Sequence, residues 1–130
     1  MKKILLLLIL FFTFPAYADV VIKYDEILKI RKALNQYYKL GVLIHKEFDL
    51  SNMGELRACV ANYGNLRNEV KSIQEKVKKL NGFSYRFSLS LASQAAFICV
   101  YCGSSGKTCS DIPIEMEQVD SMLIEAGKLP

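Results

Sequence analysis

The sequence predicts an all-α protein: a disulfide-stapled bundle of about four helices that follows a cleaved N-terminal signal peptide. Three observations support this fold class. Long segments place apolar residues at alternating spacings of three and four, which is the period of an amphipathic helix. Little of the chain has the strict alternation that is typical of strands. All four cysteines follow an apolar leader, which places them outside the reducing cytosol.

Residues 1–18 have the three parts of an export signal: a Lys-Lys start, an unbroken apolar run over 4–12 and an Ala-Tyr-Ala pattern before Asp19. We expect cleavage before Asp19. This leaves 19–130 as a single helical domain that is either periplasmic or secreted. The alternative is an uncleaved anchor helix. Because the apolar run is shorter than the roughly 20 residues that span a bilayer, we expect no stable membrane span after cleavage.

The first helix is predicted over 21–48. Its apolar stripe follows helical spacing through Ile27, Ile30, Leu34, Tyr37, Gly41, Ile44 and Phe48. Gly41 on this stripe either allows close helix contact or bends the helix. Tyr38 lies off the stripe, and because tyrosine joins a large apolar body to a polar tip, it is a candidate protein-binding residue.

The second helix is predicted as one continuous segment over 56–80, ended by Asn81-Gly82, with Ser51 or Asn52 as a possible N-cap. Its heptad seam consists of Leu56, Cys59, Tyr63, Leu66, Val70, Ile73, Val77 and Leu80. We expect this seam to pack inside its own domain. A coiled coil between two chains is the alternative.

The third helix is predicted over 84–102. It is apolar on all sides, so we expect it to be the buried central helix, and polar residues interrupt it too often for a bilayer span. A loop over 103–109 follows. The last helix begins at Asp111 and ends before Gly127; its inner face carries Met116, Val119 and Leu123.

Cys59, Cys99, Cys102 and Cys109 predict two structural disulfides, because the chain is small and exported and the count is even. With the turn near residue 82, the rise of about 1.5 Å per residue leaves Cys102 roughly 4 Å and Cys99 roughly 9 Å off the level of Cys59. This favours Cys59–Cys102 with Cys99–Cys109. The alternative, Cys59–Cys99 with Cys102–Cys109, stays open.

Other chemistry of the Cys99-x-x-Cys102 pair is less well supported. A redox pair of the thioredoxin type needs a lowered thiol pKa, and a helix C-terminus acts in the opposite direction. A zinc site usually shows two paired motifs. Attachment of haem requires a histidine at the position of Gly103. We therefore predict no metal and no cofactor.

The segment 103–108 resembles the end of a phosphate-binding loop, but Tyr101 stands where that motif requires its first glycine. We predict instead a turn held by the disulfides. Its exposed side chains, Ser104, Ser105 and Lys107, are candidates for protein binding. His45 is the only histidine, and the sequence indicates no nucleophile or acid as its partner.

After loss of the leader the chain keeps fifteen basic and thirteen acidic residues, a net charge of +2 that is too small to indicate nucleic-acid binding. No catalytic constellation is present. We expect a small periplasmic, non-enzymatic protein-binding domain of the immunity or inhibitor type, whose partner is another envelope protein or an incoming effector. The alternatives are an envelope structural or assembly factor that acts as a helical homo-oligomer, and a thiol-redox protein. The oligomeric state stays open.

Overall fold

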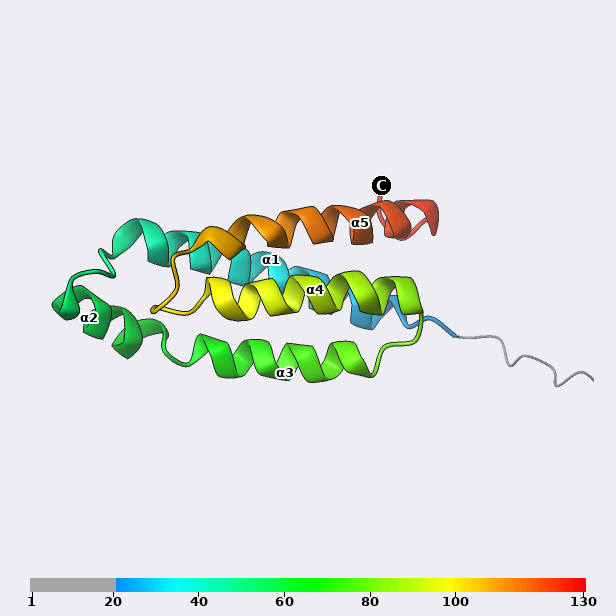
Figure 1. Ribbon diagram of the computed structural model, residues 1–130. Helices are drawn as coiled ribbons and strands as arrows, with labels where there is room; N and C mark the ends of the chain where they lie inside the picture. Colours follow the sequence, from blue (N-terminus) through cyan, green and yellow to red (C-terminus); the bar gives the residue numbers. More distant parts are fainter. Residues whose placement is uncertain (1–20) are drawn as a thin grey trace, which may run out of the picture.

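A computed structural model describes residues 21–130, and these residues fold entirely into helices and loops (Figure 1). The elements are α1 (Tyr24–Glu47), α2 (Met53–Tyr63), α3 (Leu66–Lys78), α4 (Phe83–Cys99), the 3₁₀ helix η2 (Lys107–Ser110) and α5 (Asp111–Glu125). The all-α prediction is confirmed. The predicted signal peptide, 1–18, lies outside the described residues.

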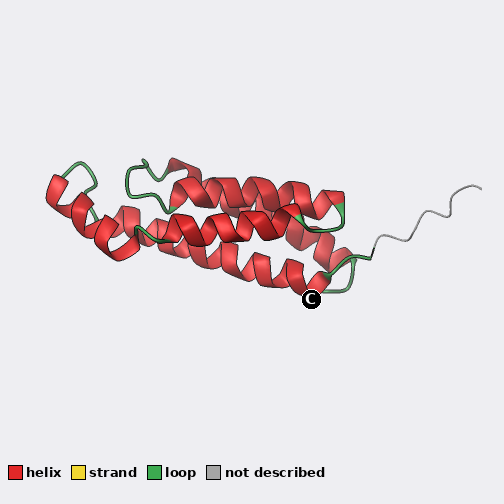
Figure 2. Cartoon of the chain, turned by 90° about the horizontal axis from the view of Figure 1, so that it is seen from below, coloured by secondary structure: helices red, strands yellow, loops and turns green. Residues whose placement is uncertain are grey.

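Four helices form the bundle, and α4 is its centre, since it packs against α1, α3 and α5 (Figure 1). The short helix α2 extends beyond the other helices at one end, while the chain enters α1 at the opposite end (Figure 2). One hydrophobic core runs through the bundle and takes side chains from every element. None of the described helices combines the length and the apolar character needed to cross a membrane.

The predicted stripe of α1 faces this core. Ile27, Leu34 and Ile44 are fully buried on it, and Gly41 is buried between them. The helix begins three residues later than predicted and ends at Glu47. The 3.6-residue period therefore identified the buried face correctly.

The prediction of one continuous helix over 56–80 is wrong, because the chain breaks into α2 and α3 at Gly64 and Asn65. A Cβ atom on Gly64 would lie only 2.5 Å from the carbonyl oxygen of Val60, so the tight turn between the helices requires a glycine. The seam nevertheless faces inward on both sides of the break: Cys59, Leu66, Val70, Ile73, Val77 and Leu80 are buried. It packs inside its own chain, as predicted.

Asn52 is the N-cap of α2, one of the two caps that the sequence suggested. Its side-chain oxygen accepts hydrogen bonds from the backbone N–H groups of Gly54 (2.9 Å) and Glu55 (3.2 Å). These bonds satisfy two donors that have no partner inside the helix. They allow α2 to begin at Met53, outside the main bundle.

The prediction that α4 is buried on all sides is also wrong. Three neighbouring helices cover three sides of α4, where Leu89, Ala92 and Cys99 are buried. The fourth side faces solvent and carries Phe83 and Phe87, both of them exposed. An apolar composition therefore marked the central helix correctly but did not show that one of its faces is free.

The last helix, α5, begins at Asp111 and buries its predicted inner residues Met116, Val119 and Leu123. Gly127 has a φ of +70° just beyond the helix, and the N–H of Lys128 donates to the carbonyl of Leu123 (2.8 Å). Residues outside the core also tie this helix to α1. Arg31 donates two hydrogen bonds to Asp120, the longer of them 3.0 Å.

Candidate functional site

Both disulfides lie at the end of the bundle that holds α2. Cys59 of α2 is bonded to Cys102, just after α4, and the two Cα atoms are 6.0 Å apart. Cys99, the last residue of α4, is bonded to Cys109 of η2 with a Cα separation of 4.7 Å. The structure thus has the connectivity that the helix geometry favoured.

All four cysteines are buried, and none is free. Two disulfides fit an extracellular or otherwise oxidising compartment. A redox motif of the thioredoxin type would bond Cys99 to Cys102 when oxidised. Here each of them is bonded to a more distant cysteine, so the pairing is the one expected of structural bridges.

We call residues 103–108 the stapled loop, because a bridged cysteine stands at each of its ends. The helix α1 supports this loop from below by passing close to the Cys99–Cys109 bridge. A Cβ atom on Gly41 would lie 2.1 Å from the Sγ of Cys99 and 3.3 Å from the Sγ of Cys109. Of the two roles open to Gly41, close approach is therefore the one that the structure shows.

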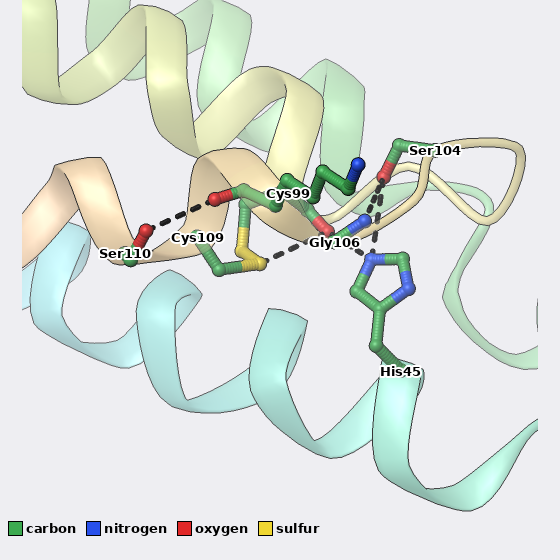
Figure 3. Close-up of a disulfide and its surroundings, with 7 residues drawn as sticks. His45, Cys99, Ser104, Gly106, Cys109 and Ser110 are labelled. Carbon is green, nitrogen blue, oxygen red and sulfur yellow. Dashed lines mark hydrogen bonds between the residues drawn. A yellow bond between two sulfur atoms is a disulfide. The ribbon is translucent and has the colours of Figure 1, made fainter.

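His45 connects α1 to the stapled loop (Figure 3). Its Nε2 lies 2.9 Å from the carbonyl oxygen of Cys99, and the hydroxyl oxygen of Ser104 lies 3.3 Å from the same nitrogen. The N–H of Gly106 donates to that hydroxyl oxygen (3.4 Å). Gly106 has a φ of +74°, and a Cβ atom there would lie 2.7 Å from the His45 ring. A larger residue at position 106 would therefore displace the imidazole.

The contact between Ser104 and His45 has the composition of a catalytic dyad but not its chemistry. A carbonyl oxygen can only accept a hydrogen bond, so Nε2 carries the proton that it donates to Cys99. A nitrogen that carries a proton cannot accept one from the serine hydroxyl, which is what a general base must do. The arrangement orders the loop rather than activating the hydroxyl.

The sequence-predicted binding residues differ in their accessibility. Ser105 and Lys107 are exposed, and Ser104 is half-buried because its hydroxyl is held by His45 and Gly106. Tyr38 is half-buried against the core on α1, about 10 Å along the helix axis from residue 45. The structure therefore brings the three loop residues together and leaves Tyr38 outside their surface.

An open recess of about 640 Å³ lies between the stapled loop and the end of α1. His45, Cys102 and Ser104 line one side, and the turn over 48–51 lines the other. In that turn the hydroxyl and the N–H of Ser51 donate to Asp49 and lower the pKa of its carboxyl group. The carboxylate of Asp49 thus gives the rim of the recess a solvent-exposed anionic group that accepts hydrogen bonds.

A second interaction that the sequence did not indicate braces the same end. The guanidinium carbon of Arg67 lies 3.9 Å from the ring centre of Phe97 and 4.3 Å from that of Tyr101. Its Nε is buried without a hydrogen-bond partner. Arg67 therefore packs as a flat cation on two rings of α4 and its extension. A helical pattern alone could only have placed Arg67 beside the seam.

Within residues 21–130, no group of three or more histidine, cysteine or acidic side chains is placed to hold a metal ion. The sequence matches no protein-family model, and neither the curated proteins nor the solved structures include a significant match to it. Functional inference therefore rests on the geometry of the chain itself.

Proposed function

We propose that this chain is a small, non-enzymatic protein-binding domain of the periplasm that docks through its stapled loop. The observation that carries the proposal is the combination of a rigid backbone with free side chains. The loop is bonded covalently at both ends and supported by His45, yet Ser105 and Lys107 remain exposed. Such a loop loses little conformational entropy on binding, which favours affinity.

The adjoining recess supplies the second part of a docking surface. Asp49 contributes a carboxylate to its lining, and Phe48 and Leu50 contribute apolar surface. Lys107 is exposed on the stapled loop that borders the recess. Partner recognition commonly combines a few apolar contacts with charged groups at the rim. The proposed partner is another envelope protein or an incoming effector that this domain would neutralise, as an immunity protein or inhibitor does.

The proposed homo-oligomer has less support, because most of its seam is buried inside the chain and only Leu56 and Tyr63 are half-buried among the seam residues. Val70 and Val77 are almost fully buried inside the chain, and Ile73 is only 9% exposed. A coiled coil between chains would need these side chains at the surface. Sedimentation of the isolated protein separates the two proposals, since a stable homodimer without partner would favour the envelope assembly role.

Site-specific photo-crosslinking in intact cells tests the docking proposal. A photoreactive residue at Ser105 should give a discrete adduct of one mass, whereas the same residue at exposed Gln118 on α5 should not. Adding Lys107→Ala should reduce the adduct. The melting temperature should stay unchanged, because Lys107 is exposed and forms no ion pair with any residue in 21–130. Adducts that are equal at both positions, or absent at both in the folded protein, would contradict the proposal.

A further inference from the structure

Two aromatic side chains are exposed at the opposite end of the bundle from the stapled loop. Phe83 and Phe87, in the first two turns of α4, are 70% and 55% exposed. Their rings stack with centres 6.0 Å apart, and the guanidinium of Arg86 lies 5.8 Å from the ring centre of Phe83. Two adjacent large apolar groups in water indicate a surface that another phase or molecule covers.

A groove lined by lysines lies on the other side of α3, between α3 and α1. It has a volume of about 540 Å³ and a floor of Ile30, Ala33 and Ile73. The basic side chains along its rim are Lys23, Lys29, Lys76 and Lys79, and Glu26 is the one acidic residue that lines it. Among the described residues none of these four lysines forms an ion pair. The groove therefore has a net positive charge above an apolar floor, with four lysines and one glutamate among its lining residues.

The last turn of α3 joins the groove to the phenylalanine pair. Lys76 and Lys79 face the groove, while Lys78 lines a recess together with Phe83 and Phe87. We call these two neighbouring surfaces, which meet at the last turn of α3, the basic–aromatic end. The chain also enters the bundle here, since the side-chain nitrogen of Asn81 donates to the carbonyl of Val21 (3.1 Å). Figure 1 shows that the chain enters α1 at the end of the bundle away from α2.

The position of the chain entry matters because the apolar run over 4–12 precedes it in sequence. Eight residues separate that run from Val21, and a fully extended chain of this length reaches no more than about 30 Å. An uncleaved leader, the alternative to cleavage, would thus hold the basic–aromatic end, rather than the stapled loop, near the bilayer surface. In the cleaved protein the surface residues alone have to supply the contact.

We propose that the basic–aromatic end docks on an anionic phospholipid membrane. Phe83 and Phe87 would enter the boundary between headgroups and acyl chains, and the lysines would lie over anionic headgroups. The chemistry favours a lipid surface over an acidic protein. Lysine acts as a flexible point charge that suits a diffuse anionic layer, and the groove has no arginine among its lining residues. Arg86, beside Phe83, donates to the carbonyl of Leu80 (3.3 Å). The stapled loop would then point away from the membrane, whether or not it has a protein partner.

Flotation of the exported, oxidised protein from Asp19 onward tests this proposal. Vesicles of equal amounts of phosphatidylcholine and phosphatidylglycerol should carry the protein upward, and vesicles of phosphatidylcholine alone should carry little. Raising the salt concentration should weaken the binding because it screens the lysines. Failure of the wild-type protein to float with the anionic vesicles would overturn the proposal, and would leave the docking of the stapled loop unaffected.

Matched variants locate the surface. The pair Lys76→Glu and Lys79→Glu should lower the partition coefficient by at least about 25-fold, since each lost basic group near an anionic surface costs about fivefold and the new carboxylates are also repelled. The pair Phe83→Ser and Phe87→Ser should lower it about tenfold. The controls are K39E with K46E and V60S with I114S, which change exposed residues away from this end. Controls that lose as much binding as the test variants, with unchanged melting curves, would overturn the assignment.

Discussion

The two ends of the bundle are ordered by different means. At the stapled end, two disulfides, the His45 contact and the Arg67 stack fix a loop and a short helix that have little core of their own. At the basic–aromatic end no disulfide is present among the described residues. There the helix ends meet through packing, such as the perpendicular contact of the Tyr24 and Tyr85 rings.

This difference shows at which end of the bundle buried apolar side chains are enough to hold the helices together, and at which end they are not. The ends of α3 and α4 near residue 82 bury Val77, Leu80 and Tyr85, so the hairpin between them needs no further support. In α2, by contrast, only Cys59 is buried. Without its bridge α2 would have too little apolar contact to stay on the bundle, and a short isolated helix is marginal in water.

The largest predicted effect comes from removing the bridges. The Cys59–Cys102 bond closes a longer loop than the Cys99–Cys109 bond, with sequence separations of 43 and 10. The chain-entropy model gives contributions of about 4 and about 3 kcal/mol. Denaturant unfolding of C59A/C102A and C99A/C109A should show this order.

Hydrogen exchange of the same variants tests the comparison between the ends. In C59A/C102A the backbone amides of α2 should lose protection, while those near Tyr85 and Val77 should keep it. The control is the wild-type protein, in which both regions should be protected to similar degrees. Equal loss of protection at both ends in the variant would show that the ends do not differ in the way proposed.

A smaller effect should follow from Gly41→Ala. The added Cβ would overlap the Sγ of Cys99, and overpacking of this kind costs about 1–3 kcal/mol. In the C99A/C109A background both nearby sulfur atoms are gone. The cost should then fall toward zero, because alanine is the better helix former by about 1 kcal/mol. The double-mutant cycle measures this coupling from unfolding curves; an equal cost in both backgrounds would contradict it.

The features that were predictable from the sequence are those that depend on the helical spacing of apolar residues. The inward stripes of α1, α3 and α5 follow from spacing, and helical rise favoured the observed disulfide connectivity without excluding the alternative pairing. The break at Gly64 was not predictable in this way, because the spacing of the seam continues through it from Cys59 to Leu66. The close approach of Gly64 to the Val60 carbonyl, which leaves no room for a Cβ atom, becomes visible only in the structure.

The candidate site was harder to predict from the sequence, because its contacts depend on tertiary structure. The loop residues Ser105 and Lys107 stand out in the sequence because cysteines flank them. His45 does not, since its contacts with Cys99 and Ser104 cross 54 and 59 positions of the chain. The exposed Phe87 was assigned to the core, because an apolar composition cannot show how many neighbours a helix has.

The smallest predicted effect is a difference in salt dependence between one carboxyl group at each end. At the stapled end, hydrogen bonds from the neutral Ser51 lower the pKa of Asp49. At the basic–aromatic end, the hydrogen bond and the charge of Lys78 lower the pKa of Glu75, with Nζ and Oε1 2.7 Å apart. Salt screens a charge but not a short neutral hydrogen bond.

NMR titration of the side-chain carboxyl carbons should therefore show that added salt raises the pKa of Glu75 and leaves that of Asp49 unchanged. Both values are lowered in the folded state. The stability that each group contributes is therefore present above the ordinary carboxyl pKa and is lost as the pH falls through the folded one. Lys78→Gln should raise the pKa of Glu75, and Ser51→Ala that of Asp49. A salt response at Asp49 as large as that at Glu75 would mean that charges, rather than local hydrogen bonds, also control the stapled end.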